Sequence, residues 1–159
     1  MNAPLKIAFA LPEDAPAEEC EVDYGRACPT IPDAEYCAVF THHETAYSFS
    51  TPKVFLWFRI VDPGPLFGTM IYAAYRVRRL KGKPRKHGAF TVAANGELFV
   101  SVCKVLSERG RPDRFSLLRL KGKILRIKTR TVKRDYRQRE IPDARRYSVV
   151  DAITGCDTG

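Results

Sequence analysis

The stretch KVFLWFRIV, Lys53 to Val61, limits the fold of this 159-residue chain more than any other segment. Alternate residues of a strand point to opposite faces, so one face carries Val54, Leu56, Phe58 and Ile60, and the other carries Phe55, Trp57, Arg59 and Val61. The first face is wholly apolar and is expected in the core. The second face is either buried as well or stacks on a flat ligand. The strand ends at DPGP, a strong turn signal.

The rest of the chain predicts a mainly β protein with one helix. Alternating patterns predict further strands at 34–44, 67–80, 123–133 and 146–153. Apolar residues at helical spacing predict a helix over 95–109, with Asn95 as its cap and Gly110 just after its end. The segment 81–88, KGKPRKHG, is expected to be an irregular basic loop.

This order of elements favours a particular fold. Three strands, a helix and two strands predict a five-stranded OB-like Greek-key barrel with one helix between strands three and four. A generic α+β sheet built from the same elements is the alternative. We expect an irregular acidic N-terminal arm at 1–30 and one OB-like domain at 31–155.

The charge of the chain is unevenly distributed. Residues 1–50 hold two basic and nine acidic residues, a balance of −7, whereas residues 51–159 hold 25 basic and nine acidic ones, a balance of +16. A field of one sign over a whole domain attracts polyanions, of which nucleic acid is the commonest in a cytoplasm. The alternative is a basic surface that is simply solvated and binds no polyanion.

Other classes of protein find little support in the sequence. No apolar run approaches the roughly 20 residues of a membrane span, and the N-terminus lacks the pattern of a signal peptide, so we expect a cytoplasmic protein without a membrane. The five cysteines form no zinc-knuckle pair, and no nucleophile elbow, phosphate loop or metalloprotease motif occurs. We therefore expect no enzyme activity, no cofactor and no metal site.

The candidate site residues are the aromatic and basic side chains that could hold a single nucleic-acid strand. Stacking platforms and phosphate-tracking cations are what such binding needs. The aromatics on strand faces are Phe55, Trp57 and Tyr75, accompanied by Arg59. Three cations, Arg126, Lys128 and Arg130, alternate on one strand and cannot all be buried. Two loops add Lys81, Lys83, Arg85 and Lys86, and Lys133, Arg134, Tyr136 and Arg137. Each aromatic could instead be a core residue, and each loop a flexible basic tip.

The chain also resembles a known family. The run FRIVDPGPLFG, Phe58 to Gly68, is similar to a phenylalanine–glycine passage of the OB-fold single-stranded-DNA-binding proteins of phages and integrated mobile elements, and LKGK, Leu120 to Lys123, is similar to their hydrophobic-x-G-K strand. As an order of elements the resemblance spans about Asp33 to Ile153. It implies non-catalytic binding of single-stranded DNA in replication, recombination or transfer of a mobile element.

Two other functions remain open at this point. The basic face could dock on an acidic protein or on a nucleic-acid-processing complex, as an interaction module or inhibitor. Alternatively, the ligand could be RNA, including structured RNA. Replication or recombination proteins are the expected protein partners, and the sequence leaves a homo-oligomer open.

The acidic arm leads to a first testable prediction. If residues 13–23 cover the basic groove when nucleic acid is absent, deletion of residues 1–30 should tighten the binding of oligo-dT, measured by anisotropy. Unchanged or weaker affinity in a truncation that still gives a folded circular-dichroism spectrum would contradict this role of the arm.

Overall fold

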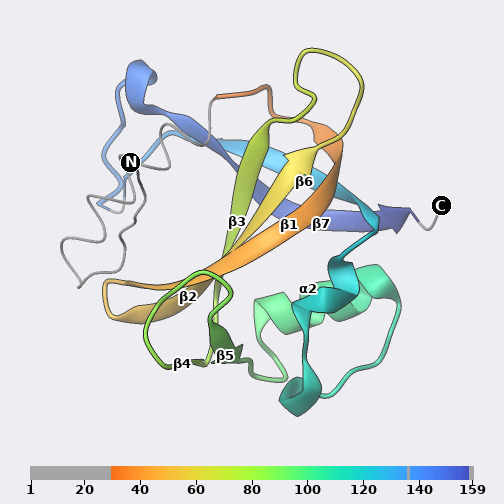
Figure 1. The fold of residues 1–159 in the computed structure, drawn as a ribbon. Coiled ribbons are helices and arrows are strands. Elements are labelled where there is room, and N and C mark those ends of the chain that lie inside the picture. Colours follow the sequence, from red (N-terminus) through yellow and green to blue (C-terminus); the bar gives the residue numbers. More distant parts are fainter. Residues whose placement is uncertain (1–29, 136, 158–159) are drawn as a thin grey trace.

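The computed structural model describes residues 30–135 and 137–157 and shows a mainly β fold (Figure 1). The strands are β1 (Glu35–Ser48), β2 (Thr51–Ile60), β3 (Met70–Arg76), β4 (Arg79–Lys81), β5 (Ala89–Thr91), β6 (Ile124–Val132) and β7 (Tyr147–Asp157). The α-helix of the described residues is α2 (Glu97–Leu106), and short 3₁₀ turns occupy Pro112–Arg114, Leu117–Leu120 and Asp143–Arg145. No helix in this part of the chain is long and apolar enough to cross a membrane.

Five strands form one antiparallel sheet in the order β3-β2-β1-β6-β7, and β4 pairs with β5 in a separate hairpin. Strand β1 pairs with β6 over Glu35–Val39 and with β2 over Ala38–Ser48. The β1–β2 register shifts between Phe40 and His42, which leaves Thr41 as an extra residue that bends and twists the strand. Edge strands β3 and β7 contact each other, but no ladder joins them in the described residues, so the predicted closed barrel is not found.

The core lies on the face of β2 that the sequence assigned to it. Val54, Leu56, Phe58 and Ile60 are all fully buried. Strand β6 shows the predicted alternation, with Leu125 and Ile127 buried between exposed cations. Helix α2 buries Leu98, Phe99 and Val102 and packs against β7 and β3.

The predicted helix ends need correction. Helix α2 is shorter than 95–109, because Gly96 rather than Asn95 is its N-cap and makes no side-chain cap. At the other end Ser107 adopts a left-handed φ of 55°, and its N–H bonds to Lys104 O. The helix therefore stops three residues before Gly110.

The connection expected after the first strand is a tight hairpin instead. Phe49 and Ser50 adopt left-handed φ values of 51° and 67°, which matches a two-residue turn between twisted strands. Strand β1 therefore continues to Ser48, beyond the predicted 34–44, and β2 begins at Thr51.

The predicted strand 67–80 and loop 81–88 are also divided differently. Strand β3 ends at Arg76, and Lys81 belongs to β4, where it pairs with Ala89 of β5. The loop between β4 and β5 is fastened to β1, because the Thr45 N–H donates to the Arg85 carbonyl at 3.0 Å and the Thr45 hydroxyl accepts from the Arg85 N–H at 3.0 Å.

A buried serine fastens the start of the described chain to the last strand. Ser148 is fully buried, and its Oγ accepts from the Ile31 N–H at 2.9 Å and donates to the Ile31 carbonyl at 3.1 Å. Ile31 itself is 4% exposed and belongs to the core. Two hydrogen bonds therefore join Ile31 to strand β7.

Replacing this serine should destabilise the fold. Ser148→Ala leaves both backbone groups of Ile31 without their partner, and unpaired buried groups cost about 1–3 kcal/mol. Urea unfolding should show this loss, whereas Ser101→Ala on α2 should change the free energy of unfolding by less than about 0.5 kcal/mol. Equal stability of the two variants would show that the contact contributes nothing.

Candidate functional site

A cavity of about 790 Å³ opens on the second face of β2 and β3. Its walls come from the β1–β2 turn, the segment that joins β6 to β7, the first half of β7 and the start of α2. In Figure 1 the β1–β2 turn and the β6–β7 connection both lie on the left of the view. The cavity therefore lies between two connections, with the sheet as its floor.

Aromatic side chains line much of this cavity. Phe55 and Tyr72 lie on neighbouring strands, with ring centroids 5.4 Å apart and planes at 77°, the edge-to-face arrangement that aromatic pairs favour. Both are buried. Tyr47 and Phe49, at the β1–β2 turn, are 37% and 47% exposed, and Tyr147 of β7 completes the set. The rings at the turn thus present surface on which a flat ligand could stack.

Four cations line the same cavity: Lys53, Arg130, Lys133 and Arg134. Lys53 is half-buried beside Phe55, and burial, followed by the charge of Arg76, lowers the pKa of its ammonium group. An anion bound here would favour the charged form of Lys53 and relieve this penalty. The lining is thus suited to a ligand that is both aromatic and anionic.

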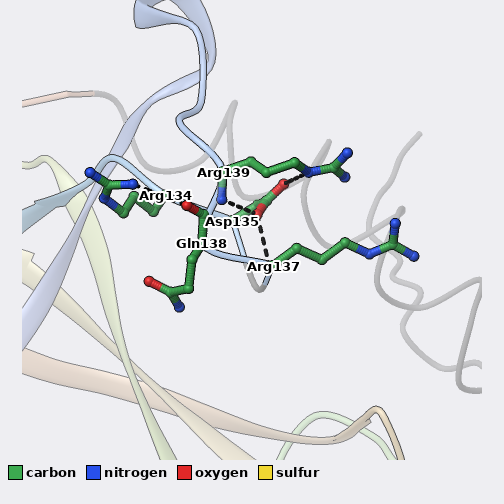
Figure 2. A network of polar contacts seen from close by, with 5 residues as sticks. All are labelled: Arg134, Asp135, Arg137, Gln138 and Arg139. Atoms are coloured by element: carbon green, nitrogen blue, oxygen red, sulfur yellow. Dashed lines mark hydrogen bonds and ion pairs between the residues drawn. The ribbon is translucent and has the colours of Figure 1, made fainter.

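The cations of the β6–β7 connection stand on an ordered hairpin (Figure 2). Asp135 organises its tip, because Oδ1 accepts from the N–H groups of Arg137 at 2.8 Å and Arg139 at 2.9 Å. The Arg134 guanidinium donates to the Gln138 carbonyl at 3.0 Å. Arg134 extends to one side of the hairpin, towards the cavity that it lines, whereas Arg137 and Arg139 extend to the other side.

No protein-family model, curated protein or solved structure matches this chain. The interpretation of the cavity therefore rests on the chemistry of its own residues.

The structure brings together only part of the predicted site. The residues that line the cavity are Phe55, Tyr75, Arg130, Lys133 and Arg134. Those that do not line it are Trp57, Arg59, Lys81, Lys83, Arg85, Lys86, Arg126, Lys128 and Arg137. Tyr136 lies outside the described residues, as do residues 1–29 of the predicted acidic arm.

Trp57 is a core residue of the second face and not an exposed stacking platform. It is 6% exposed, its indole stacks on the His42 ring with centroids 6.1 Å apart, and it meets the edge of Tyr72 at 5.3 Å. The sequence could not distinguish a buried Trp57 from one that stacks on a ligand, because either role places an aromatic residue on a strand face. Arg59 is exposed farther along β2, opposite Met70.

The cations of β6 do not form a face of one sign. Arg126 lies 3.6 Å from Asp157 and Arg130 lies 3.1 Å from Asp151, both aspartates being on the neighbouring strand β7. Two-residue steps along a strand are about 6.6 Å, so Arg126 is about 13 Å from Arg130 and too far along β6 to share the cavity. The alternation of residues within β6 could not reveal these two ion pairs, because the aspartates lie on another strand and are distant in sequence.

The loop between β4 and β5 lies over β1 and away from the cavity walls. His43 Nε2 is 2.8 Å from the Gly88 carbonyl, and burial lowers the pKa of this imidazole, so the neutral ring donates this hydrogen bond. His87 contacts the rings of both His42 and His43. Among the described residues no group of three or more His, Cys, Asp or Glu side chains could hold a metal ion.

Sequence reasoning missed several cavity residues: Tyr47, Phe49, Lys53, Tyr72 and Tyr147. Tyr47 and Phe49 belong to the segment AYSFSTP, residues 46–52, which lies between the predicted strand 34–44 and the stretch that begins at Lys53. The signal available was the density of aromatics in that short connection, which ordinary polar turns lack.

The order of the hairpin should depend on pH. Hydrogen bonds from the Arg139 and Arg137 N–H groups lower the pKa of the Asp135 carboxyl below its ordinary 3.8. A depressed pKa means that the stabilisation is present at neutral pH and is lost as pH falls through the folded-state value. A carboxyl titration followed by NMR should therefore have its midpoint below 3.8, and the Arg137 and Arg139 amides should exchange faster below it.

A variant separates this from general acid unfolding. Asp135→Asn should speed amide exchange in the hairpin at neutral pH, whereas Asp113→Asn, in a separate exposed turn, should leave the hairpin unchanged. A titration midpoint at or above the ordinary value would show that Asp135 does not organise the tip.

Proposed function

We propose that this chain binds single-stranded nucleic acid, with DNA as the ligand, in the cavity over β2 and β3, and that it does so without catalysis. The observation that carries the proposal is the lining of that cavity, where aromatic rings and cations face one space. Base stacking and phosphate contact are the two interactions that sequence-tolerant binding of single strands uses. The excess of positive charge over residues 51–159 would attract the strand.

We further propose that the fold is OB-like. The order of elements supports this, because three antiparallel strands of the sheet are followed, after the small β4–β5 hairpin, by a helix and two more strands of the sheet. Strand β1 also pairs with both β2 and β6. OB folds bind oligonucleotides on the face of strands two and three, between the loop joining strands one and two and the loop joining strands four and five. The cavity of this chain lies between the corresponding connections, 49–50 and 133–146.

A role in replication, recombination or transfer of a phage or mobile element is the biological setting that we propose. It is supported by the resemblance at Phe58–Gly68, where the glycines are needed for the backbone. Gly64 and Gly68 adopt φ values of 132° and 88°, which L side chains rarely take. Replication or recombination proteins are the partners that this setting suggests.

Binding of labelled oligo-dT of about 15 nucleotides, measured by anisotropy at several salt concentrations, tests the proposal. Affinity should fall as salt rises, and Lys53→Gln or Lys133→Gln should weaken binding and reduce the salt slope by about one. Lys104→Gln, at the exposed end of α2, removes the same charge away from the cavity and should leave binding unchanged.

A matched pair of aromatic variants tests stacking in the same assay. Phe49→Asn removes the ring but suits the left-handed backbone of the turn, and should weaken binding by about 1–3 kcal/mol, or about 5- to 150-fold. Phe67→Asn changes an exposed ring of the β2–β3 turn outside the cavity and should have no effect.

Two results would reject this function. The first is an absence of oligo-dT binding at low salt by the folded protein, which would favour docking of the basic face on an acidic protein. The second is binding that the cavity variants leave intact while Lys104→Gln weakens it, which would place the ligand elsewhere. Stronger binding of duplex RNA than of oligo-dT would favour structured RNA as the ligand.

A further inference from the structure

We propose that the inner end of the cavity, beside the start of α2, selects a guanine base and that Glu97 is the residue that reads it. This inference rests on the proposed binding of single strands and adds a specificity to it. Three described residues meet at this end of the cavity: Tyr75 of β3, Glu97 of α2 and Asp151 of β7.

Tyr75 is a buried residue of the cavity wall, and its hydroxyl is a candidate hydrogen-bond donor to a ligand. The residue is 4% exposed and lines the cavity. Burial, followed by the charges of Glu97 and Asp151, raises the pKa of Tyr75. The hydroxyl therefore keeps its proton and is available as a donor.

Glu97 is the carboxylate available to a ligand here. Asp151 already accepts from the Arg130 guanidinium, with Oδ1 3.1 Å from Nε. Glu97 is exposed at the first position of α2 and has no ion pair or side-chain hydrogen bond in the described part of the chain. A carboxylate accepts hydrogen bonds only, and it can accept two donors side by side.

The first turn of α2 also carries backbone donors that no side chain caps. Gly96, the N-cap of α2, has no side chain to cap the helix, so the N–H groups of the first turn keep their capacity to donate. The Tyr75 hydroxyl, which lines the same cavity as Glu97, is the donor that a ligand could use together with this carboxylate. The inner end of the cavity thus combines adjacent acceptors with a donor.

Guanine is the base whose Watson–Crick edge complements this arrangement. It carries two adjacent donors, N1–H and N2–H, next to the acceptor O6. Thymine, uracil, adenine and cytosine each present at least one acceptor where guanine has a donor, so each would place a lone pair against the carboxylate. The Tyr72 and Phe55 rings near this end provide the apolar surroundings that a base face needs.

Oligo-dT with one central dG, compared with the plain oligo-dT and with one central deoxyinosine, tests the selection in full-length protein. The dG oligonucleotide should bind about tenfold more tightly than oligo-dT, since a bidentate contact discriminates bases to this extent. Deoxyinosine lacks the N2 amino group and should lose most of this gain.

Variants assign the effect to the residues. Glu97→Gln should abolish the dG preference, because it replaces one acceptor by a donor. Glu108→Gln makes the same change outside the cavity, where Glu108 pairs with Arg119 at 2.9 Å, and should keep the preference. Tyr75→Phe removes only the hydroxyl and should reduce the preference.

Equal affinity of wild-type protein for the dG and plain oligonucleotides would overturn the selection while leaving the proposed function standing. A dG preference that survives Glu97→Gln would overturn the role of Glu97. If none of the oligonucleotides binds, the proposed function fails and this inference fails with it.

Discussion

The fold depends on a single strand that belongs to both halves of the sheet. Strand β1 pairs with β6 through its first residues and with β2 through the rest, so its ladders are what join the two halves into one sheet in the described residues. The extra residue at Thr41 bends β1 between these partners. That bend brings the edge strands β3 and β7 into contact without pairing them. The cavity lies where β2, β3 and β7 come close to one another, and residues of all three strands line it.

The same curvature decides which charges act together. Arg130 and Lys133 reach the cavity because they lie at the end of β6, whereas Arg126 lies at its start and faces Asp157. Two cations thus lie at one end of the strand beside the aromatic floor of β2 and β3, although Asp151 pairs with Arg130 there as well. The net charge of the chain does not predict where these cations lie. Their positions follow from the arrangement of the strands in the sheet.

The sequence was sufficient for local structure and insufficient for contacts between distant segments. The core face of β2 and the alternation of β6 were predicted because each is a property of one strand. The burial of Trp57 against His42 and the pairing of Arg126 with Asp157 depend on the neighbours that the sheet provides. The hairpin at Phe49 was missed because left-handed backbone there falls on residues without the usual glycine or asparagine signal.

The bond between Ile31 and Ser148 also sets the point from which the preceding residues depart. Ser148 lies between Tyr147 and Val149, both of which line the cavity. In the sequence, the acidic residues 13–23 shortly precede Ile31, which these hydrogen bonds hold beside the cavity. Covalent attachment at such a point gives a short segment an effective concentration on the order of millimolar. If the acidic residues 13–23 bind in the cavity, as predicted from their charge, a free ligand would have to compete with that local concentration.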